Sequence, residues 1–90
     1  MAVVLLGWWV GLQGLEWAII FITITLVWMA EFLNTALEAV VDLASPQQHP
    51  LAKVGKDVGA AAVLLTALAA VIIGILVLGP PLWARLSMLF

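Results

Sequence analysis

Two long apolar stretches separated by a polar one dominate the hydrophobic pattern of the chain. Residues 15–43 begin with the Glu16-Trp17 pair, are uncharged from Ala18 to Ala30 and carry their other acidic residues toward the far end. Residues 53–79 contain an apolar core over 58–78. A transmembrane helix needs about 20 mainly apolar residues, at a rise of about 1.5 Å each. The pattern predicts membrane-spanning helices over 15–43 and 53–79, joined by a loop over 44–52.

The two ends of the chain are not predicted to span the membrane. Gly79-Pro80-Pro81 is expected to end the second helix, because proline lacks the backbone donor and clashes with the preceding turn, and this leaves residues 80–90 as a tail. The apolar run 1–12 would span only about 18 Å as a helix, short of the ~30 Å of hydrocarbon. It also lacks the positively charged start of a secretory signal. We interpret it as the far half of a helix whose near half would lie upstream of Met1.

Composition supports a membrane protein. Of the 90 residues, 67% are hydrophobic and 9% are charged, whereas soluble domains are about 45–50% apolar and about 25% charged. We therefore predict an all-α integral membrane protein of one domain. A net charge of -2 with three scattered basic residues argues against a nucleic-acid partner. The absence of cysteine excludes disulfides and thiolate metal sites.

The loops predict the topology. Lys53 and Lys56 fall in the polar stretch 45–57, which the positive-inside tendency places in the cytoplasm, although Arg85 beyond the second helix argues mildly the other way. The helix count then places residues 11–14 and the C-terminal tail on the opposite side. Indoles prefer membrane interfaces. Four tryptophans are expected near that far interface: Trp8, Trp9, Trp17 and Trp83.

Polar residues at the end of the first long helix form one stripe. At about 100° per residue, they share a face about 100° wide: Glu31, Asn34, Thr35, Glu38 and Asp42. A charged side chain at membrane depth costs about 2.5–3.5 kcal/mol on insertion scales, so it usually faces a protein interior and serves a function. The alternative is that Glu38 and Asp42 are simply solvated near the helix end and that Asn34 and Thr35 hydrogen-bond between helices.

The second long helix begins with a polar face of its own. Lys53, Lys56 and Asp57 share that face, and the small residues 59–62 follow and permit close helix packing. A two-helix hairpin would bring the acidic and basic faces together at the cytoplasmic interface. Carboxylates bind Mg²⁺ and lysine binds phosphate. Since no Walker or kinase glycine-rich loop is present, any phosphoryl transfer must use another scaffold.

These residues carry a family resemblance. The run EFLNTALEAVVD, followed by HPLAKVGKDVGAAAVLL, closely resembles the signature of the prokaryotic-type diacylglycerol kinases, which include undecaprenol kinases, and the resemblance covers residues 15 to 81. It implies an enzyme of the bacterial inner membrane, usually a homotrimer of three-helix subunits. Such an enzyme moves the γ-phosphoryl group of Mg-ATP onto a lipid hydroxyl at the cytoplasmic interface. In a trimer we expect composite sites, with nucleotide-side and base-side residues from different subunits.

The resemblance also implies residue roles. Glu31 matches the general base for the lipid hydroxyl, and Glu38 matches a carboxylate that binds Mg²⁺. For His49 a solvated loop histidine is an equal alternative to nucleotide contact. The implied nucleotide-binding residues are Asn34, Asp42, His49, Lys53, Lys56 and Asp57.

The start of the chain departs from this family pattern. Members normally begin with a cytoplasmic amphipathic helix and a full first span, and this upstream region supplies a further acidic metal ligand, whereas Met1 here falls inside that span. Two hypotheses follow. The first is a lipid kinase with undecaprenol as the preferred acceptor, because the HPLAK loop resembles that branch, and with diacylglycerol as the second choice. The alternative is a non-catalytic membrane assembly subunit.

Overall fold

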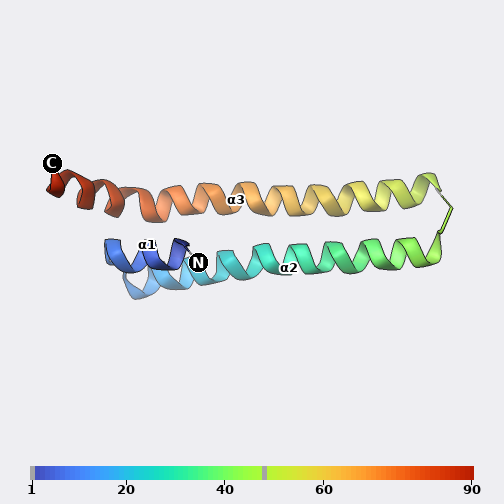
Figure 1. Cartoon of the computed structure of the whole chain (residues 1–90), viewed down its shortest axis with the longest axis horizontal. Coiled ribbons are helices and arrows are strands. Elements are labelled where there is room, and N and C mark those ends of the chain that lie inside the picture. Colours follow the sequence, from blue (N-terminus) through green and yellow to red (C-terminus); the bar gives the residue numbers. More distant parts are fainter. Residues whose placement is uncertain (1, 48) are drawn as a thin grey trace.

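The computed structural model describes residues 2–47 and 49–90 and consists of three helices (Figure 1). They are α1 (Ala2–Val10), α2 (Gly14–Ala44) and α3 (Pro50–Leu89). The long helices α2 and α3 run antiparallel as a hairpin 59 Å long and about 20 Å across, and α1 lies beside the first turns of α2. The predicted all-α class is confirmed. Met1 of the predicted partial helix and Gln48 of the predicted loop lie outside the described residues.

Both long helices suit a bilayer. With 31 and 40 residues, α2 and α3 are about 46 and 60 Å long at 1.5 Å per residue, more than the ~30 Å of hydrocarbon. Within the described chain the buried apolar side chains are Leu12, Ile20 and Leu78. Most other large apolar side chains point outward, as Phe21 does with 73% of its surface exposed. Such a surface requires an apolar surrounding, and the two predicted spans are confirmed as helices of sufficient length and composition.

The connection between α1 and α2 is tight. Gly11 has a φ of +77°, a left-handed conformation that glycine adopts without strain, and it reverses the chain direction. The backbone N–H of Gln13 then donates to Glu16 Oε1 at 3.1 Å and caps the start of α2. A Cβ atom at Gly7 would lie 2.8 Å from the Trp17 indole. Glycine at this position therefore leaves room for the Trp17 indole of α2 against α1.

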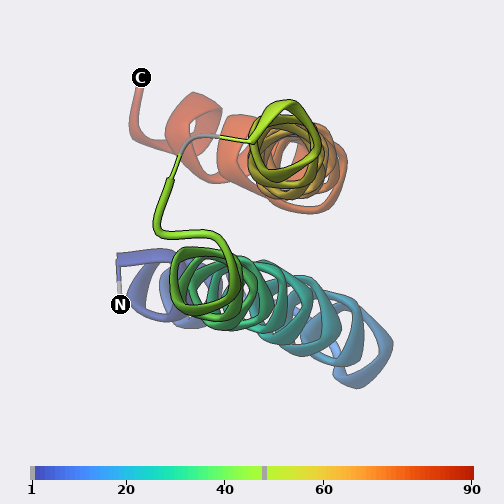
Figure 2. The same ribbon diagram turned by 90° about the vertical axis from the view of Figure 1, so that its right-hand side faces the viewer.

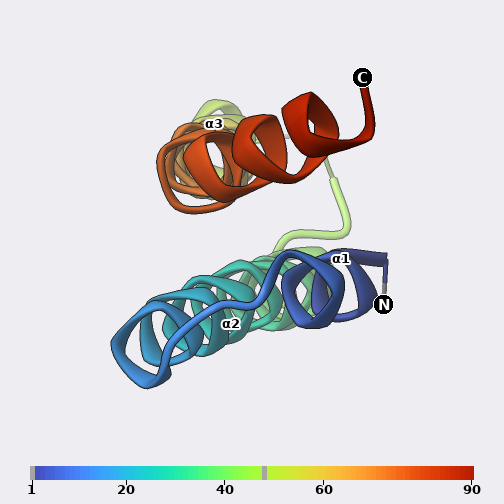
Figure 3. The same ribbon diagram turned by 90° about the vertical axis from the view of Figure 1, so that its left-hand side faces the viewer.

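The prediction that α3 ends at Gly79 is wrong. The helix continues through Pro80 and Pro81 to Leu89. The two prolines remove two backbone donors, but their fixed φ of about −65° is compatible with helical geometry, so the helix bends instead of stopping. The last turns of α3 accordingly lean away from the axis of its earlier part (Figure 3).

The loop between the long helices is shorter than the predicted 44–52. Residues 45–49 connect α2 to α3, because α3 begins at Pro50 and not at residue 53. Proline is favoured in the first turn of a helix, where its missing N–H would have no partner. His49 caps this turn by accepting a hydrogen bond at Nδ1 from the Leu51 N–H, 3.0 Å away. The view along the hairpin shows this connection crossing between the two helices (Figure 2).

Tryptophans gather at the opposite end of the hairpin. Trp8 and Trp9 lie in the last turn of α1, Trp17 lies in the first turn of α2, and Trp83 lies in the last turns of α3. These helix ends lie together, far from residues 45–49 (Figure 1). The Arg85 guanidinium stacks on the Trp9 ring, 5.5 Å from its centroid. The structure thus places the four indoles at the end that the helix count predicts.

Candidate functional site

A polar cleft lies where α2 and α3 approach their connection. It has a volume of about 710 Å³ and collects residues from the end of α2, from the turn and from the first two turns of α3. The polar residues that line it are Asp42, Ser45, Gln47, His49, Lys53, Lys56 and Asp57. The sequence separates these residues by up to 15 positions, and the antiparallel hairpin brings them together.

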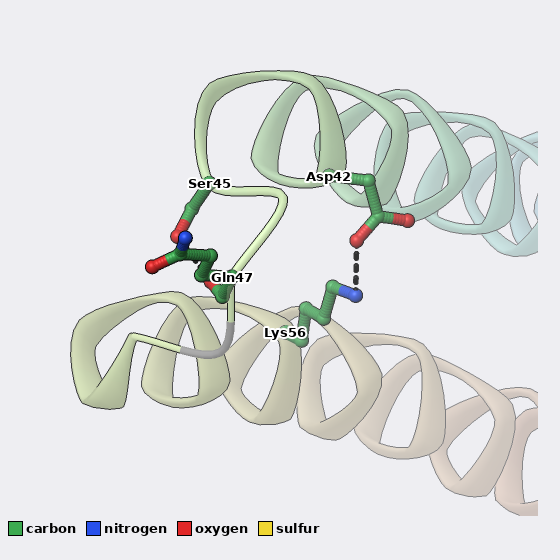
Figure 4. Close-up of polar contacts among 4 residues, drawn as sticks. All are labelled: Asp42, Ser45, Gln47 and Lys56. Atoms are coloured by element: carbon green, nitrogen blue, oxygen red, sulfur yellow. Dashed lines mark hydrogen bonds and ion pairs between the residues drawn. The ribbon is translucent and has the colours of Figure 1, made fainter.

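An ion pair crosses the cleft. Asp42 Oδ1 on α2 pairs with Lys56 Nζ on α3 (Figure 4). Both side chains keep access to water, with 63% of the Asp42 side chain and 39% of the Lys56 side chain exposed. An exposed pair of this kind contributes little to folding. The Lys56 ammonium therefore stays available to an anionic ligand that enters from water.

The turn below the ion pair is held by its own hydrogen bonds. The Ser45 N–H donates to the Val41 carbonyl at 2.8 Å, which closes the last turn of α2. The Ser45 hydroxyl donates to the Gln47 carbonyl at 2.7 Å (Figure 4). With the His49 cap, these bonds fix where α3 starts. The capping role of His49 was missed from the sequence, although a proline at the first helical position, here Pro50, is a recognised helix-start signal.

Deeper along the hairpin, Asn34 on α2 meets Gly59 on α3. A Cβ atom added at Gly59 would collide with Asn34 Oδ1 and would lie 3.1 Å from Leu37 Cδ2. Asn34 Oδ1 is buried and has no hydrogen-bond partner among the residues that the structure describes. Asn34 does not line the polar cleft. It lines a separate, mostly apolar groove of about 510 Å³ between the helices, together with Leu33, Leu37, Gly59 and Thr66, among others.

Glu31 and Glu38 take a different position from the other candidates. Both are exposed, and neither lines the cleft or the groove. Glu38 precedes Asp42 by one helical turn, so the Cβ atoms of the two are about 5–6 Å apart. Glu31 precedes Asp42 by 11 residues, which is about 16 Å along the helix axis. Among the described residues, the acidic row and the lysine row form an ion pair at the end of α2, where Asp42 pairs with Lys56.

Comparison with known proteins identifies the family of the chain. The model of the family described as prokaryotic diacylglycerol kinase matches residues 1–78. This chain belongs to that family. The predicted family is thereby confirmed.

Three relatives illustrate the range within the family. The undecaprenol kinase of Bacillus subtilis is 46% identical over 81 residues, which is 90% of this chain and 66% of that protein. A diacylglycerol kinase of Synechocystis is 53% identical over 72 residues, 79% of this chain and 41% of that protein. The diacylglycerol kinase of Escherichia coli K12 is 36% identical over 69 residues, 77% of this chain and 57% of that protein. The chain thus spans less than two thirds of the length of these curated relatives, and none of the solved structures matches it.

For a member of this family of kinases, the metal to consider is Mg²⁺. The described residues contain no group of three or more His, Cys, Asp or Glu side chains close enough to hold a metal ion on their own. Mg²⁺, however, is usually bound by one or two carboxylates together with substrate phosphates. Glu38 and Asp42, one turn apart on α2, supply such a pair beside the cleft. The two carboxylates therefore fit a Mg²⁺ ion that arrives with a nucleoside triphosphate.

Proposed function

We propose that this chain is a lipid kinase that transfers the γ-phosphoryl group of ATP to a lipid alcohol at the cytoplasmic face of the bacterial inner membrane. The observation that carries the proposal is the polar cleft at the end of two apolar spans, where Asp42 and Lys56 meet. Undecaprenol is the preferred acceptor, because the match to an undecaprenol kinase covers 90% of the chain. Diacylglycerol is the second choice, in view of the diacylglycerol kinases among the relatives.

The order of the acidic residues along α2 supports a direction in which ATP binds. Asp42 lies at the cleft, Glu38 lies one turn deeper, and Glu31 lies about 10 Å beyond Glu38 toward the membrane centre. An ATP molecule bound at the cleft, with its phosphates pointing into the membrane, would bring its γ-phosphate toward the depth of Glu31. Lys53 and Lys56 then hold phosphate oxygens, while His49 and Asp57, which also line the cleft, complete the proposed nucleotide contacts. When bound, Mg²⁺ supplies positive charge to the phosphate oxygens.

Glu31 is proposed to act on the lipid. Its carboxylate accepts the proton of the lipid hydroxyl as that oxygen bonds to the γ-phosphorus and the bond to the bridging oxygen of ADP breaks. The products are the lipid phosphate and ADP. A base at membrane depth meets a lipid headgroup, whereas ATP reaches the cleft from water, so the two substrates approach from different phases.

A homotrimer would complete the site. Glu31 is exposed in the single chain, whereas a charged side chain at membrane depth is expected to face a protein interior. A neighbouring subunit, related by a symmetry axis along the membrane normal, would place its cleft at the same membrane depth as the cleft of the first subunit. Its helices would then supply the protein surface that Glu31 of the first subunit faces. We therefore propose composite sites that combine Glu31 of one subunit with the cleft of the next.

The kinase activity is tested by reconstituting the chain in liposomes with γ-labelled ATP, Mg²⁺ and either undecaprenol or diacylglycerol. We expect label to appear in the lipid phase, with undecaprenol as the better acceptor. Liposomes without protein provide the blank. Absence of transfer to both lipids, from protein that is helical and membrane-inserted, would instead support the non-catalytic assembly subunit.

Composite sites predict a specific complementation result. Glu31→Gln subunits and Lys56→Gln subunits, each strongly impaired alone at an ATP concentration below the parent KM, are unfolded, mixed in equal amounts and reassembled. If base and lysine come from neighbouring subunits, about a quarter of the sites in random trimers combine both intact residues, and activity returns to that fraction. Reassembly of each variant alone is the control. A mixture that stays as inactive as its components would contradict the composite arrangement.

Replacing Lys56 should affect ATP binding far more than folding. Because Lys56 is water-accessible and its partner Asp42 is exposed, we expect Lys56→Gln to leave the unfolding midpoint nearly unchanged. The loss of a charge-assisted contact to phosphate should raise the KM for ATP by about tenfold or more. Steady-state kinetics against ATP provide the measurement. Lys56→Arg keeps the positive charge and should recover part of the affinity, whereas equal defects in both variants would argue against a charge contact.

A further inference from the structure

The apolar groove continues the polar cleft along the contact between α2 and α3. On α2 the lining of the cleft reaches inward to Val41, and the lining of the groove runs from Leu37 to Leu26, so about one helical turn separates the two. On α3 the lining passes from Asp57 in the cleft to Gly59 in the groove. The groove extends for about 16 Å along α2. A polar space open to water is therefore followed, on the same pair of helices, by an apolar space within the span.

The lining of the groove suits a ligand that is apolar along its length and polar at one end. Leucine, methionine and alanine side chains form most of it, and Ala62 and Ala69 remain exposed within it. Among the described residues that line it, Asn34 and Thr66 are polar. The Thr66 hydroxyl donates to the Ala62 carbonyl of its own helix at 2.8 Å. Binding sites for small molecules are mostly apolar in the same way, and a few polar groups orient the ligand.

Asn34 is the polar residue at the end of the groove nearest the cleft. Its Oδ1 is buried against Gly59 and has no hydrogen-bond partner among the described residues. The amide nitrogen, on the other branch of the side chain, is directed away from Gly59, so its two N–H donors remain for a ligand. Asn34 follows Glu31 by three residues on α2, which places it within about 5 Å of the membrane depth of Glu31. A ligand held by Asn34 therefore has its polar end at the depth of the proposed base.

We propose that the groove holds the first part of the hydrocarbon chain of the acceptor lipid, and that the Asn34 amide donates a hydrogen bond to the oxygen of the lipid alcohol. This proposal rests on the lipid kinase activity proposed above, and it assigns Asn34 to the lipid instead of the nucleotide. A nucleotide does not suit the groove, because its charges would lose their hydration against leucine side chains. The alcohol oxygen then lies where the groove meets the cleft, and Glu31 of a neighbouring subunit accepts the hydroxyl proton.

Photo-cross-linking without ATP tests the position of the lipid independently of phosphoryl transfer. A long-chain prenyl alcohol that carries a diazirine next to its hydroxyl is photolysed in liposomes with the parent protein, and mass spectrometry identifies the labelled residues. We expect label in the groove, at Ala62 and Thr66, and its loss with excess unlabelled alcohol. Label spread evenly over outward side chains such as Phe21 and Ile72, or label that excess alcohol does not remove, would overturn the proposal. A protein labelled in the groove that transfers no phosphate would reject the kinase activity alone.

Filling the groove gives a matched pair of variants. Ala62→Leu adds side-chain volume inside the groove, whereas Ala61→Leu adds the same atoms at an exposed neighbour that lines neither the groove nor the cleft. We expect Ala62→Leu to raise the KM for the lipid by about tenfold, which corresponds to the loss of about two buried methylene groups of the ligand. The KM for ATP should stay at the parent value in both variants. Equal KM values for the lipid in the two variants would overturn the proposal.

Asn34→Ala separates a lipid contact of Asn34 from a nucleotide contact. The loss of one hydrogen bond to the alcohol oxygen should raise the KM for the lipid by about threefold to tenfold and leave the KM for ATP unchanged. Because Oδ1 is buried without a partner, its removal should not lower the unfolding midpoint. A rise in the KM for ATP with an unchanged KM for the lipid would overturn the assignment of Asn34 to the lipid.

Discussion

Replacing Glu31 with glutamine is expected to lower the rate of phosphoryl transfer to lipid by at least about 100-fold, within the range of about 10²–10⁴ typical of a lost general base. Glutamine keeps the shape of the side chain but does not accept the proton of the lipid hydroxyl. Since Glu31 is exposed and lines neither the cleft nor the groove, helix formation and ATP affinity should change little. Initial rates in liposomes, circular dichroism and the KM for ATP separate these effects.

Glu16→Gln is the matched control for Glu31→Gln. It changes a carboxylate on the same helix at the opposite end of the hairpin. Glutamine also serves in the third position of a capping box, so the contact with the Gln13 N–H is kept. We expect near-parent activity from this control. A Glu31→Gln protein that transfers phosphate at a comparable rate would reject Glu31 as the base.

The second large effect is expected from Gly59→Ala. The added Cβ would collide with Asn34 Oδ1 and press on Leu37 Cδ2, so α2 and α3 must separate or Asn34 must move. Overpacking of this kind typically destabilises by about 1–3 kcal/mol. Separation of the helices would also widen the distance between Asp42 and Lys56, so we expect kinase activity to fall. The free energy of unfolding in mixed micelles and the phosphoryl-transfer rate provide the measurements.

Gly55→Ala is the matched control, because Gly55 lies one turn earlier on the same helix and a Cβ there would meet nothing within 4 Å. This substitution should leave stability unchanged or raise it by up to about 1 kcal/mol, since alanine favours helix. Adding Asn34→Ala to Gly59→Ala removes the colliding oxygen and should recover part of the lost stability, in a non-additive way. Equal destabilisation by the two alanines would contradict the close approach at Gly59.

The long elements were predictable because their lengths follow from membrane thickness. The predicted first span, 15–43, differs from α2 by a single residue at each end. The end of α3 was predicted wrongly because Pro80 and Pro81 were treated as a stop. In the structure their fixed φ allows the helix to continue with a bend. A local rule about proline does not indicate whether the residues that follow, among them the helix formers Leu82, Ala84 and Leu86, continue the helix.

The positions of the candidate site residues were predictable only where they follow from helix periodicity or from the antiparallel pairing of α2 and α3. Periodicity places Glu31 and Asp42 on one face, but it does not convey that about 16 Å of helix separates them. The cleft collects Asp42 and four of the candidates that follow it in the chain, His49, Lys53, Lys56 and Asp57. Asn34 instead faces Gly59. That contact depends on the register of α2 against α3, which the spacing of small residues alone does not set.

The short connection over residues 45–49 has a consequence for the proposed binding of a nucleotide at the cleft. With the Ser45 hydrogen bonds on one side and the His49 cap on the other, α2 and α3 have little freedom to slide past each other by a helical turn. The cleft proposed to hold the phosphates therefore exists before a nucleotide arrives, and the proposed binding would lose little conformational entropy in the backbone. Affinity at such a preorganised cleft should depend mainly on charge, and should weaken steeply as salt concentration rises.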